Sequence, residues 1–143
     1  MPDYSLNQFL ASAGTPLLDI EICDVTLRDG EQMPGVVFRA DEKLDIALRL
    51  DEIGVEVIEA GFPVVSPAEM NAVREVCNLG LDARISALSR SVKKDVDAAL
   101  QCGVDMISVF IATSDLHLKH KLHMSCPEAI SCALQTVEYA KDH

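Results

Sequence analysis

The sequence has little positive charge, no long apolar run and no closely spaced pair of cysteines. Twelve lysine and arginine residues stand against 23 aspartate and glutamate residues, which leaves a net charge of −11. An acidic surface repels nucleic acids and anionic membranes, so neither is expected as a partner. No uninterrupted apolar stretch approaches the roughly 18 residues that a membrane span needs. Residues 1–16 lack the basic start and apolar core of a signal peptide. A cytoplasmic location is therefore expected.

The cysteines are few and scattered. There are five of them, at positions 23, 77, 102, 126 and 132, and no two have the short spacing of a zinc knuckle. An odd number without paired spacing also argues against a disulfide framework. We expect free thiols that are buried or half-buried.

A three-residue motif of glycine, an apolar residue and an acidic residue recurs at residues 54–56, 80–82 and 103–105. Each copy follows a helical pattern and precedes an apolar run that is typical of a strand. These expected strands are residues 55–60, 81–87 and 104–112, with an earlier one over 17–23. Repeats 26 and 23 residues apart suit one strand, one helix and their loops. Each glycine is expected to end its helix in the left-handed conformation.

Helix starts are marked by polar residues that accept hydrogen bonds from the first turn. Ser66 and Ser125 are each followed three residues later by glutamate, with proline between them, which is the pattern of a capping box. The expected helices begin at caps Asp41, Ser66, Ser91 and Ser125, and the last three run towards Cys77, Cys102 and Ala140, respectively.

The alternation of strand and helix predicts the fold class. Near-continuous apolar strands are typical of a parallel sheet with helices outside it. We therefore expect an α/β domain of about four parallel βα units over residues 17–143. Residues 1–16 show no strong periodicity and are interpreted as an N-terminal arm.

Residues 24–32 read Asp-Val-Thr-Leu-Arg-Asp-Gly-Glu-Gln and lie between an expected strand and an expected helix. Aspartate is a hard ligand for a divalent cation. Arginine presents a planar fork that matches a carboxylate or an enolate oxygen. Gly30 lets the backbone turn without a Cβ penalty. The residues alone fit two interpretations equally, a metal and oxyanion site or an ordinary surface turn.

Three motifs in order carry a family resemblance: residues 24–32, residues 58–63 (Ile-Glu-Ala-Gly-Phe-Pro) and residues 110–117 (Phe-Ile-Ala-Thr-Ser-Asp-Leu-His). Together they resemble the 2-isopropylmalate, homocitrate and citramalate synthases of the DRE-TIM metallolyase superfamily, which also includes 3-hydroxy-3-methylglutaryl-CoA lyase. The resemblance covers residues 17–143. It implies the N-terminal half of a TIM (β/α)8 barrel, because a closed barrel typically needs about 250 residues. A truncated or incomplete catalytic domain is the resulting expectation.

The resemblance also implies roles for residues near the first two strand ends. Asp29 is the implied metal ligand. Arg28 is implied to hold the 2-oxo acid and polarise its carbonyl, and Gln32 to position the same region. Glu59 is implied to belong to the active site, as the base or as a group that orients it; a buried structural carboxylate is the alternative. Asp24 is interpreted as an orienting residue.

Further along, Leu88, Thr113 and His117 are the candidate substrate contacts. In lysine-pathway homocitrate synthases a histidine corresponds to Leu88 and meets the distal carboxylate of 2-oxoglutarate, whereas leucine suits an apolar 2-oxo acid. Methanogen-type homocitrate synthases also resemble this chain, and Leu88 as a simple core residue would carry no information. The identity of the 2-oxo acid therefore stays open. Thr113 and His117 match the family's fourth strand-end loop.

The implied cofactors are a divalent metal (Mg²⁺, Mn²⁺ or Zn²⁺) and acetyl-CoA as cosubstrate. The family completes its metal site with a His-x-His pair on a later strand, and no such pair occurs in this sequence. We therefore expect one metal ligand rather than a complete site, and no activity from the 143-residue polypeptide alone.

The leading functional hypothesis is Claisen condensation of acetyl-CoA with a 2-oxo acid, most like 2-isopropylmalate synthase of leucine biosynthesis. Homocitrate or citramalate synthesis is a close alternative, and cleavage of a 3-hydroxyacyl-CoA by a lyase is another. A non-catalytic half-barrel that associates with a partner is an alternative of a different class. The resemblance further implies a homo-oligomer.

Overall fold

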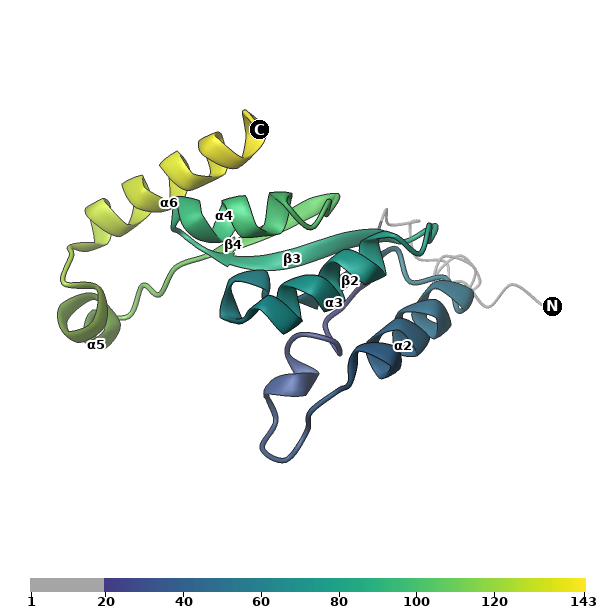
Figure 1. Ribbon diagram of the computed structural model, residues 1–143. Helices are drawn as coiled ribbons and strands as arrows, with labels where there is room; N and C mark the ends of the chain where they lie inside the picture. Colours follow the sequence, from purple (N-terminus) through teal and green to yellow (C-terminus); the bar gives the residue numbers. More distant parts are fainter. Residues whose placement is uncertain (1–19) are drawn as a thin grey trace, which may run out of the picture.

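The computed structural model describes residues 20–143, in which four parallel strands form one sheet (Figure 1). The strands are β1 (Cys23–Asp24), β2 (Val57–Gly61), β3 (Arg84–Arg90) and β4 (Met106–Phe110), and their order in the sheet is their order in the chain. A helix separates each strand from the next. This arrangement is that of a partial TIM barrel, so the predicted fold class is confirmed. The predicted N-terminal arm and residues 17–19 of the predicted first strand lie outside the described residues.

The helical elements follow the strands in alternation. They are η1 (Gly30–Gln32), α2 (Ala40–Glu52), η2 (Pro63–Val65), α3 (Pro67–Cys77), α4 (Lys93–Leu100), α5 (Asp115–His117), the π-helical turn η3 (Leu118–Leu122) and α6 (Cys126–Lys141). Helix α3 packs against β2 and β3, α4 against β3, and α6 against β4. None of the helices within residues 20–143 is long and apolar enough to cross a bilayer.

Strands β2, β3 and β4 begin two or three residues later than predicted, and β1 is confined to Cys23–Asp24 within the described residues. Two acidic residues that directly precede β2 and β4 bond neighbouring backbone instead. The side chain of Glu56 accepts a hydrogen bond from the Ile22 amide at 2.9 Å. That of Asp105 accepts one from the Ile85 amide at 2.7 Å. Each carboxylate thus satisfies a backbone donor where a neighbouring strand begins. The predicted left-handed glycines are confirmed, since φ is +84° at residue 54, +69° at 80 and +80° at 103.

The predicted helix caps are partly correct. Ser125 and Glu128 form the complete capping box of α6, with Glu128 Oε2 accepting from the Ser125 amide at 2.7 Å. Ser66 caps α3 by accepting from the Glu69 amide at 3.1 Å. The side chain of Glu69 does not return to Ser66, however, because it is used elsewhere in the molecule.

Two other predicted caps are wrong. Helix α2 begins one residue before Asp41, whose carboxylate instead binds the guanidinium of the actual cap, Arg39. Ser91 is buried and donates its hydroxyl proton to the Phe110 carbonyl at 3.1 Å, so it joins two strand ends. Val92 occupies the cap position of α4 without a side-chain bond.

The cysteines are free, as predicted, but two of them are not buried. Cys23 lies on the short edge strand β1 and Cys126 in the first turn of α6, and both are exposed. The other three are buried or half-buried.

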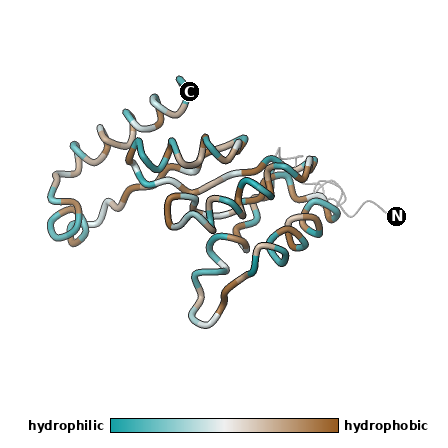
Figure 2. The backbone as a smooth tube through the Cα atoms, viewed as in Figure 1, coloured by the Kyte–Doolittle hydropathy of each residue, from teal (hydrophilic) through white to brown (hydrophobic). Residues whose placement is uncertain are grey.

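The hydrophobic core fills the space between one face of the sheet and the helices. Successive side chains of a strand point to opposite faces, so alternate residues of β2 and β3 face the helices. The fully or almost fully buried members are Ile58, Ala60, Ile85 and Ala87 from the strands, and Ala47, Val73, Val76 and Ala99 from the helices. Many of them are small, which allows the helices to lie close to the sheet. Figure 2 shows hydrophobic and hydrophilic residues alternating along the helices, as one-sided burial requires.

Two isoleucines test this description of the core. Ile58 is 0% exposed and Ile53 is 77% exposed. We expect Ile58→Ala to lower the free energy of unfolding by about 2–5 kcal/mol, since it removes buried methylene groups and leaves a cavity. Ile53→Ala should change it by less than about 0.5 kcal/mol. Urea denaturation followed by circular dichroism measures both values, and equal losses would show that the core is misplaced.

Candidate active site at the carboxyl ends of the strands

The face of the sheet that is turned away from the core carries polar side chains. Glu59 of β2 is paired in register with Ser86 of β3, so both point to this face. The hydroxyls of Ser86 and Ser108 lie 3.3 Å apart. Leu88 is paired with Ser108 and therefore lies on the same face, towards the strand ends. Glu59 and Leu88, both predicted site residues, thus share one face of the sheet.

The loop after β1 makes a sharp turn that is stabilised from within. Asp24 accepts hydrogen bonds from the amide and the hydroxyl of Thr26, at 2.8 and 3.1 Å. The Val25 carbonyl accepts from the successive amides of residues 28–30. Leu27 is 0% exposed and anchors the loop in the core. Asp24 therefore orients the turn, as the sequence analysis proposed for it.

This turn directs Arg28 back onto β2. Its Nε donates to Oε2 of Glu59 at 2.5 Å, and its NH1 lies 2.5 Å from Oδ1 of Asp29. The Glu59 side chain is only 4% exposed, whereas that of Asp29 is 61% exposed. The structure thus brings three predicted residues together: a buried carboxylate, a half-buried guanidinium and a carboxylate that is open to solvent.

The charges of Glu59, Asp24 and Arg28 also act on the neighbouring residue Cys23. Although Cys23 is an exposed residue, the pKa of its thiol is raised, first by partial desolvation and then by the negative charges of Glu59 and Asp24, while Arg28 acts in the opposite direction. Arg28 is the group that offsets the negative charge at this end of the sheet.

A pocket of about 330 Å³ opens next to the ion pair. Its polar lining includes Arg28, Gln32, Glu31 and Glu69, and its apolar lining includes Phe62 and valines of the loops after β1 and β2. Gln32 thus lines the same pocket as Arg28, and its role in positioning this region stays a prediction. Such a pocket, mostly apolar with a few convergent polar groups, has the size and character of a small-molecule site.

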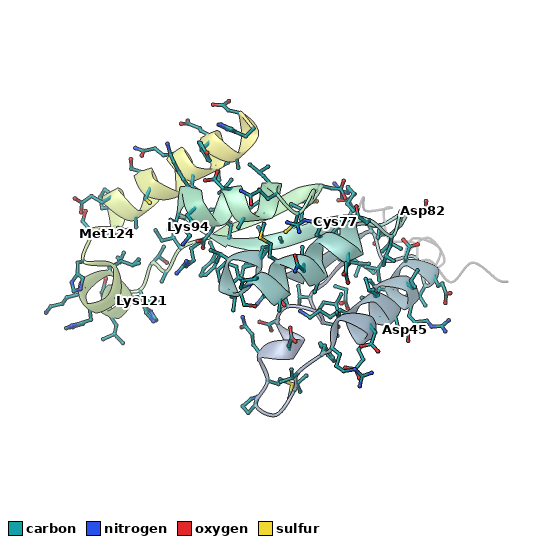
Figure 3. The ribbon with its side chains drawn as sticks, viewed as in Figure 1. Asp45, Cys77, Asp82, Lys94, Lys121 and Met124 are labelled. Atoms are coloured by element: carbon teal, nitrogen blue, oxygen red, sulfur yellow. The ribbon has the colours of Figure 1, made fainter. Side chains whose placement is uncertain are left out.

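Two predicted contacts, Thr113 and His117, lie on the loop after β4 and do not line this pocket. Both are exposed, and the His117 ring is 2.8 Å from the Ser114 hydroxyl. In Figure 3, Lys121 of the adjoining turn and Asp45 of α2 lie at opposite ends of the molecule. Among residues 20–143, no hydrogen bond or ion pair joins Thr113 or His117 to Arg28, Asp29 or Glu59, and their role as substrate contacts stays a prediction.

The described part of the chain offers no complete metal centre. No group of three histidine, cysteine, aspartate or glutamate side chains within residues 20–143 is arranged to hold an ion. Asp29 is nevertheless suited to be one ligand, because its carboxylate is exposed on a tight turn and has an oxygen that is not bonded to Arg28.

The sequence analysis missed a buried charge cluster beside the pocket. The ammonium of Lys43 contacts the carboxylates of Glu31 and Glu69. The signal in the sequence was a lysine four residues before the buried Ala47, on the inward face of α2. It also missed Arg90 at the end of β3, which binds the buried Asp95 through two nitrogens, at 2.6 and 2.9 Å.

Comparison with known proteins assigns the family. Residues 19–143 match the sequence profile described as HMGL-like. The chain belongs to the HMGL-like family. It is 57% identical over 140 residues to homocitrate synthase AksA of Methanosarcina mazei, a match that covers 98% of this chain and 35% of that protein. It is 56% identical over 124 residues to 2-isopropylmalate synthase of Methanocaldococcus jannaschii, covering 87% of this chain and 24% of that protein.

The HMGL-like chain thus spans about a third or less of the length of these curated relatives. A solved structure, HMG-CoA lyase of Bacillus subtilis, superimposes with a TM-score of 0.69 at 23% identity, covering 86% of this chain and 43% of that chain. At this identity the likeness concerns the fold alone. The family resemblance predicted from the three sequence motifs is confirmed.

The importance of the Arg28–Glu59 ion pair for stability can be tested by substitution. Arg28→Met should lower the free energy of unfolding by about 3 kcal/mol, because it leaves the Glu59 carboxylate buried without a cation. The double variant Arg28→Met/Glu59→Gln should recover most of this loss. Arg49 forms an exposed pair with Glu52 on α2, so Arg49→Met serves as the control and should cost less than about 1 kcal/mol. Guanidinium denaturation measures all three; a double variant as unstable as Arg28→Met would contradict the assignment.

Proposed function

We propose that this chain supplies the 2-oxo acid half of the active site in a Claisen synthase that condenses acetyl-CoA with a 2-oxo acid. The observation that carries the proposal is the side-by-side arrangement of Arg28, Glu59 and Asp29 at the ends of β1 and β2. Catalytic groups of βα barrels gather at this end of the strands. The similarity to homocitrate and 2-isopropylmalate synthases supports the same reaction class.

Each residue has a chemical task in this proposal. Arg28 binds the 2-oxo acid and stabilises the alkoxide that forms on its carbonyl carbon when the acetyl-CoA enolate attacks. Asp29 contributes one ligand to a divalent ion; such an ion, when bound, polarises the ketone as a Lewis acid. Glu59 fixes the guanidinium plane through the Nε bond, and Asp29 holds NH1, which leaves NH2 to bind the substrate. Gln32, which lines the pocket, orients the substrate.

The 2-oxo acid itself is proposed to have an apolar side chain. Leu88 lies on the same face as Glu59, nearer the strand ends, and is half-buried. An apolar contact there favours a branched aliphatic 2-oxo acid, as for 2-isopropylmalate synthase, over a dicarboxylic one. The two relatives are equally similar in sequence, so homocitrate synthesis is the second candidate.

The proposed reaction can be tested by assaying the purified protein as its gene encodes it. The alkoxide takes up a proton, and water then hydrolyses the thioester of the condensed product and frees the CoA thiol. Thiol release from acetyl-CoA should therefore require a 2-oxo acid and Mg²⁺ or Mn²⁺, with branched aliphatic acids preferred over 2-oxoglutarate. Arg28→Lys keeps a cation near Glu59 but loses the planar fork, so we expect kcat to fall about 100-fold or more. Arg49→Lys, at an exposed pair on α2, is the matched control and should leave kcat unchanged.

Two outcomes would reject the proposal. One is full kcat in the Arg28→Lys variant, which would show that the guanidinium has no role in the transition state. The other is cleavage of 3-hydroxy-3-methylglutaryl-CoA without any condensation, which would assign the lyase reaction instead.

A further inference from the structure

Lys43 of α2 is 2% exposed, although lysine is among the residues least often buried. Its Nζ donates to Oε2 of Glu69 at 2.6 Å and lies 2.7 Å from Oε2 of Glu31. A buried ammonium needs partners for both its charge and its N–H groups. The two carboxylates supply them, and they come from two different segments of the chain.

Each of these carboxylates uses its second oxygen to hold a loop. Oε1 of Glu31 accepts a hydrogen bond from the Phe38 amide at 3.0 Å. Oε1 of Glu69 accepts one from the Phe62 amide at 3.1 Å. One ammonium, two carboxylates and two loop amides therefore form a continuous chain of bonds.

This chain of bonds joins the two segments that carry the ion pair of the proposed active site. Glu31 lies in η1, immediately after the turn that presents Arg28. Phe62 directly follows β2, the strand that carries Glu59. Lys43 thus links the loop after β1 to the loop after β2, and its partners Glu31 and Glu69 line the same pocket.

The neighbouring backbone is shaped to admit this link. A Cβ atom at Gly61 would lie 2.1 Å from Oε1 of Glu69 and 2.9 Å from Cγ2 of Val73. Any side chain at this position would push the Glu69 carboxylate off the Phe62 amide. The glycine therefore leaves the space through which Glu69 reaches the loop.

We propose that Lys43 is a positioning residue, which sets the geometry of the Arg28–Glu59 pair by tying the two strand-end loops together. It acts through Glu31 and Glu69 and does not itself contact substrate. Its kinetic consequence rests on the proposed function. A displacement of about 1 Å in a catalytic group can reduce turnover about 100-fold, so the effect on kcat should be large.

The decisive variant is the neutral triple, Lys43→Met/Glu31→Gln/Glu69→Gln, in the native gene product. It leaves no unpaired buried charge, so stability should be close to native even where Lys43→Met alone fails to fold. The glutamine oxygens can still accept from the Phe38 and Phe62 amides, but nothing joins the two loops. Arg49→Met/Glu52→Gln removes an exposed charge pair from the same helix and is the matched control.

We expect kcat of the triple variant to be about 100-fold lower, with the KM for acetyl-CoA changed less than about threefold. The control should keep the native kcat. A purely structural role for Lys43 predicts something different, namely that kcat recovers together with stability. A triple variant with native stability and a kcat within threefold of native would overturn the proposal.

A spectroscopic readout separates this inference from the proposed function. In the native protein the Arg28 Nε proton is bonded to Glu59 and should give a distinct, slowly exchanging NMR signal. In the triple variant its exchange with water should be at least about tenfold faster, while the control leaves it unchanged. Unchanged exchange in the triple variant refutes the positioning role, whether or not the protein condenses acetyl-CoA. Absence of condensation in the native protein, with accelerated exchange in the variant, rejects only the proposed function.

Discussion

The ion pair between Arg28 and Glu59 is the interaction on which the site depends. A carboxylate on a strand loses most of its hydration, and it is stable there only if a cation replaces the water. The Glu59 side chain is 4% exposed, and its partner comes from 31 residues earlier in the chain. Because the partner lies on a loop, the pair also fixes that loop against the sheet. The same contact therefore stabilises the fold and orients the guanidinium.

The charge of the chain also affects which substrates it can bind. A chain with a net charge of −11 disfavours anionic substrates at its surface. Around the pocket the same excess of acid holds, since each of two cations is bound by two carboxylates in fixed geometry: Arg28 by Glu59 and Asp29, and Lys43 by Glu31 and Glu69. Fixed charges of this kind need no reorganisation when a substrate binds, which is what electrostatic stabilisation of a transition state requires.

The sequence predicted most of the fold, because the glycine-apolar-acidic repeat and the capping residues report local backbone preferences. Through the family motifs it assigned Arg28, Asp29 and Glu59 to one site, but it did not predict the direct bond between Arg28 and Glu59. It could not predict the Lys43 cluster, because a lysine on a helix is usually solvated and the two glutamates meet it only in the folded chain. The same limitation misassigned Ser91 and Asp41, whose side chains have tertiary or local partners that outweigh helix capping. Whether Thr113 and His117 reach the substrate also depends on how the folded segments are arranged, which the sequence does not specify.

In the proposed function, the Arg28 guanidinium and the Asp29 carboxylate face a 2-oxo acid bound to a divalent ion. The most direct measurement is paramagnetic broadening of NMR signals by Mn²⁺, in the protein as its gene encodes it and with a 2-oxo acid present. The Arg28 Nε–H signal and the Gly30 amide signal should broaden first, and Asp29→Asn should weaken the effect. Broadening centred on residues 117–123, with the Arg28 and Gly30 signals unchanged, would contradict the proposed function.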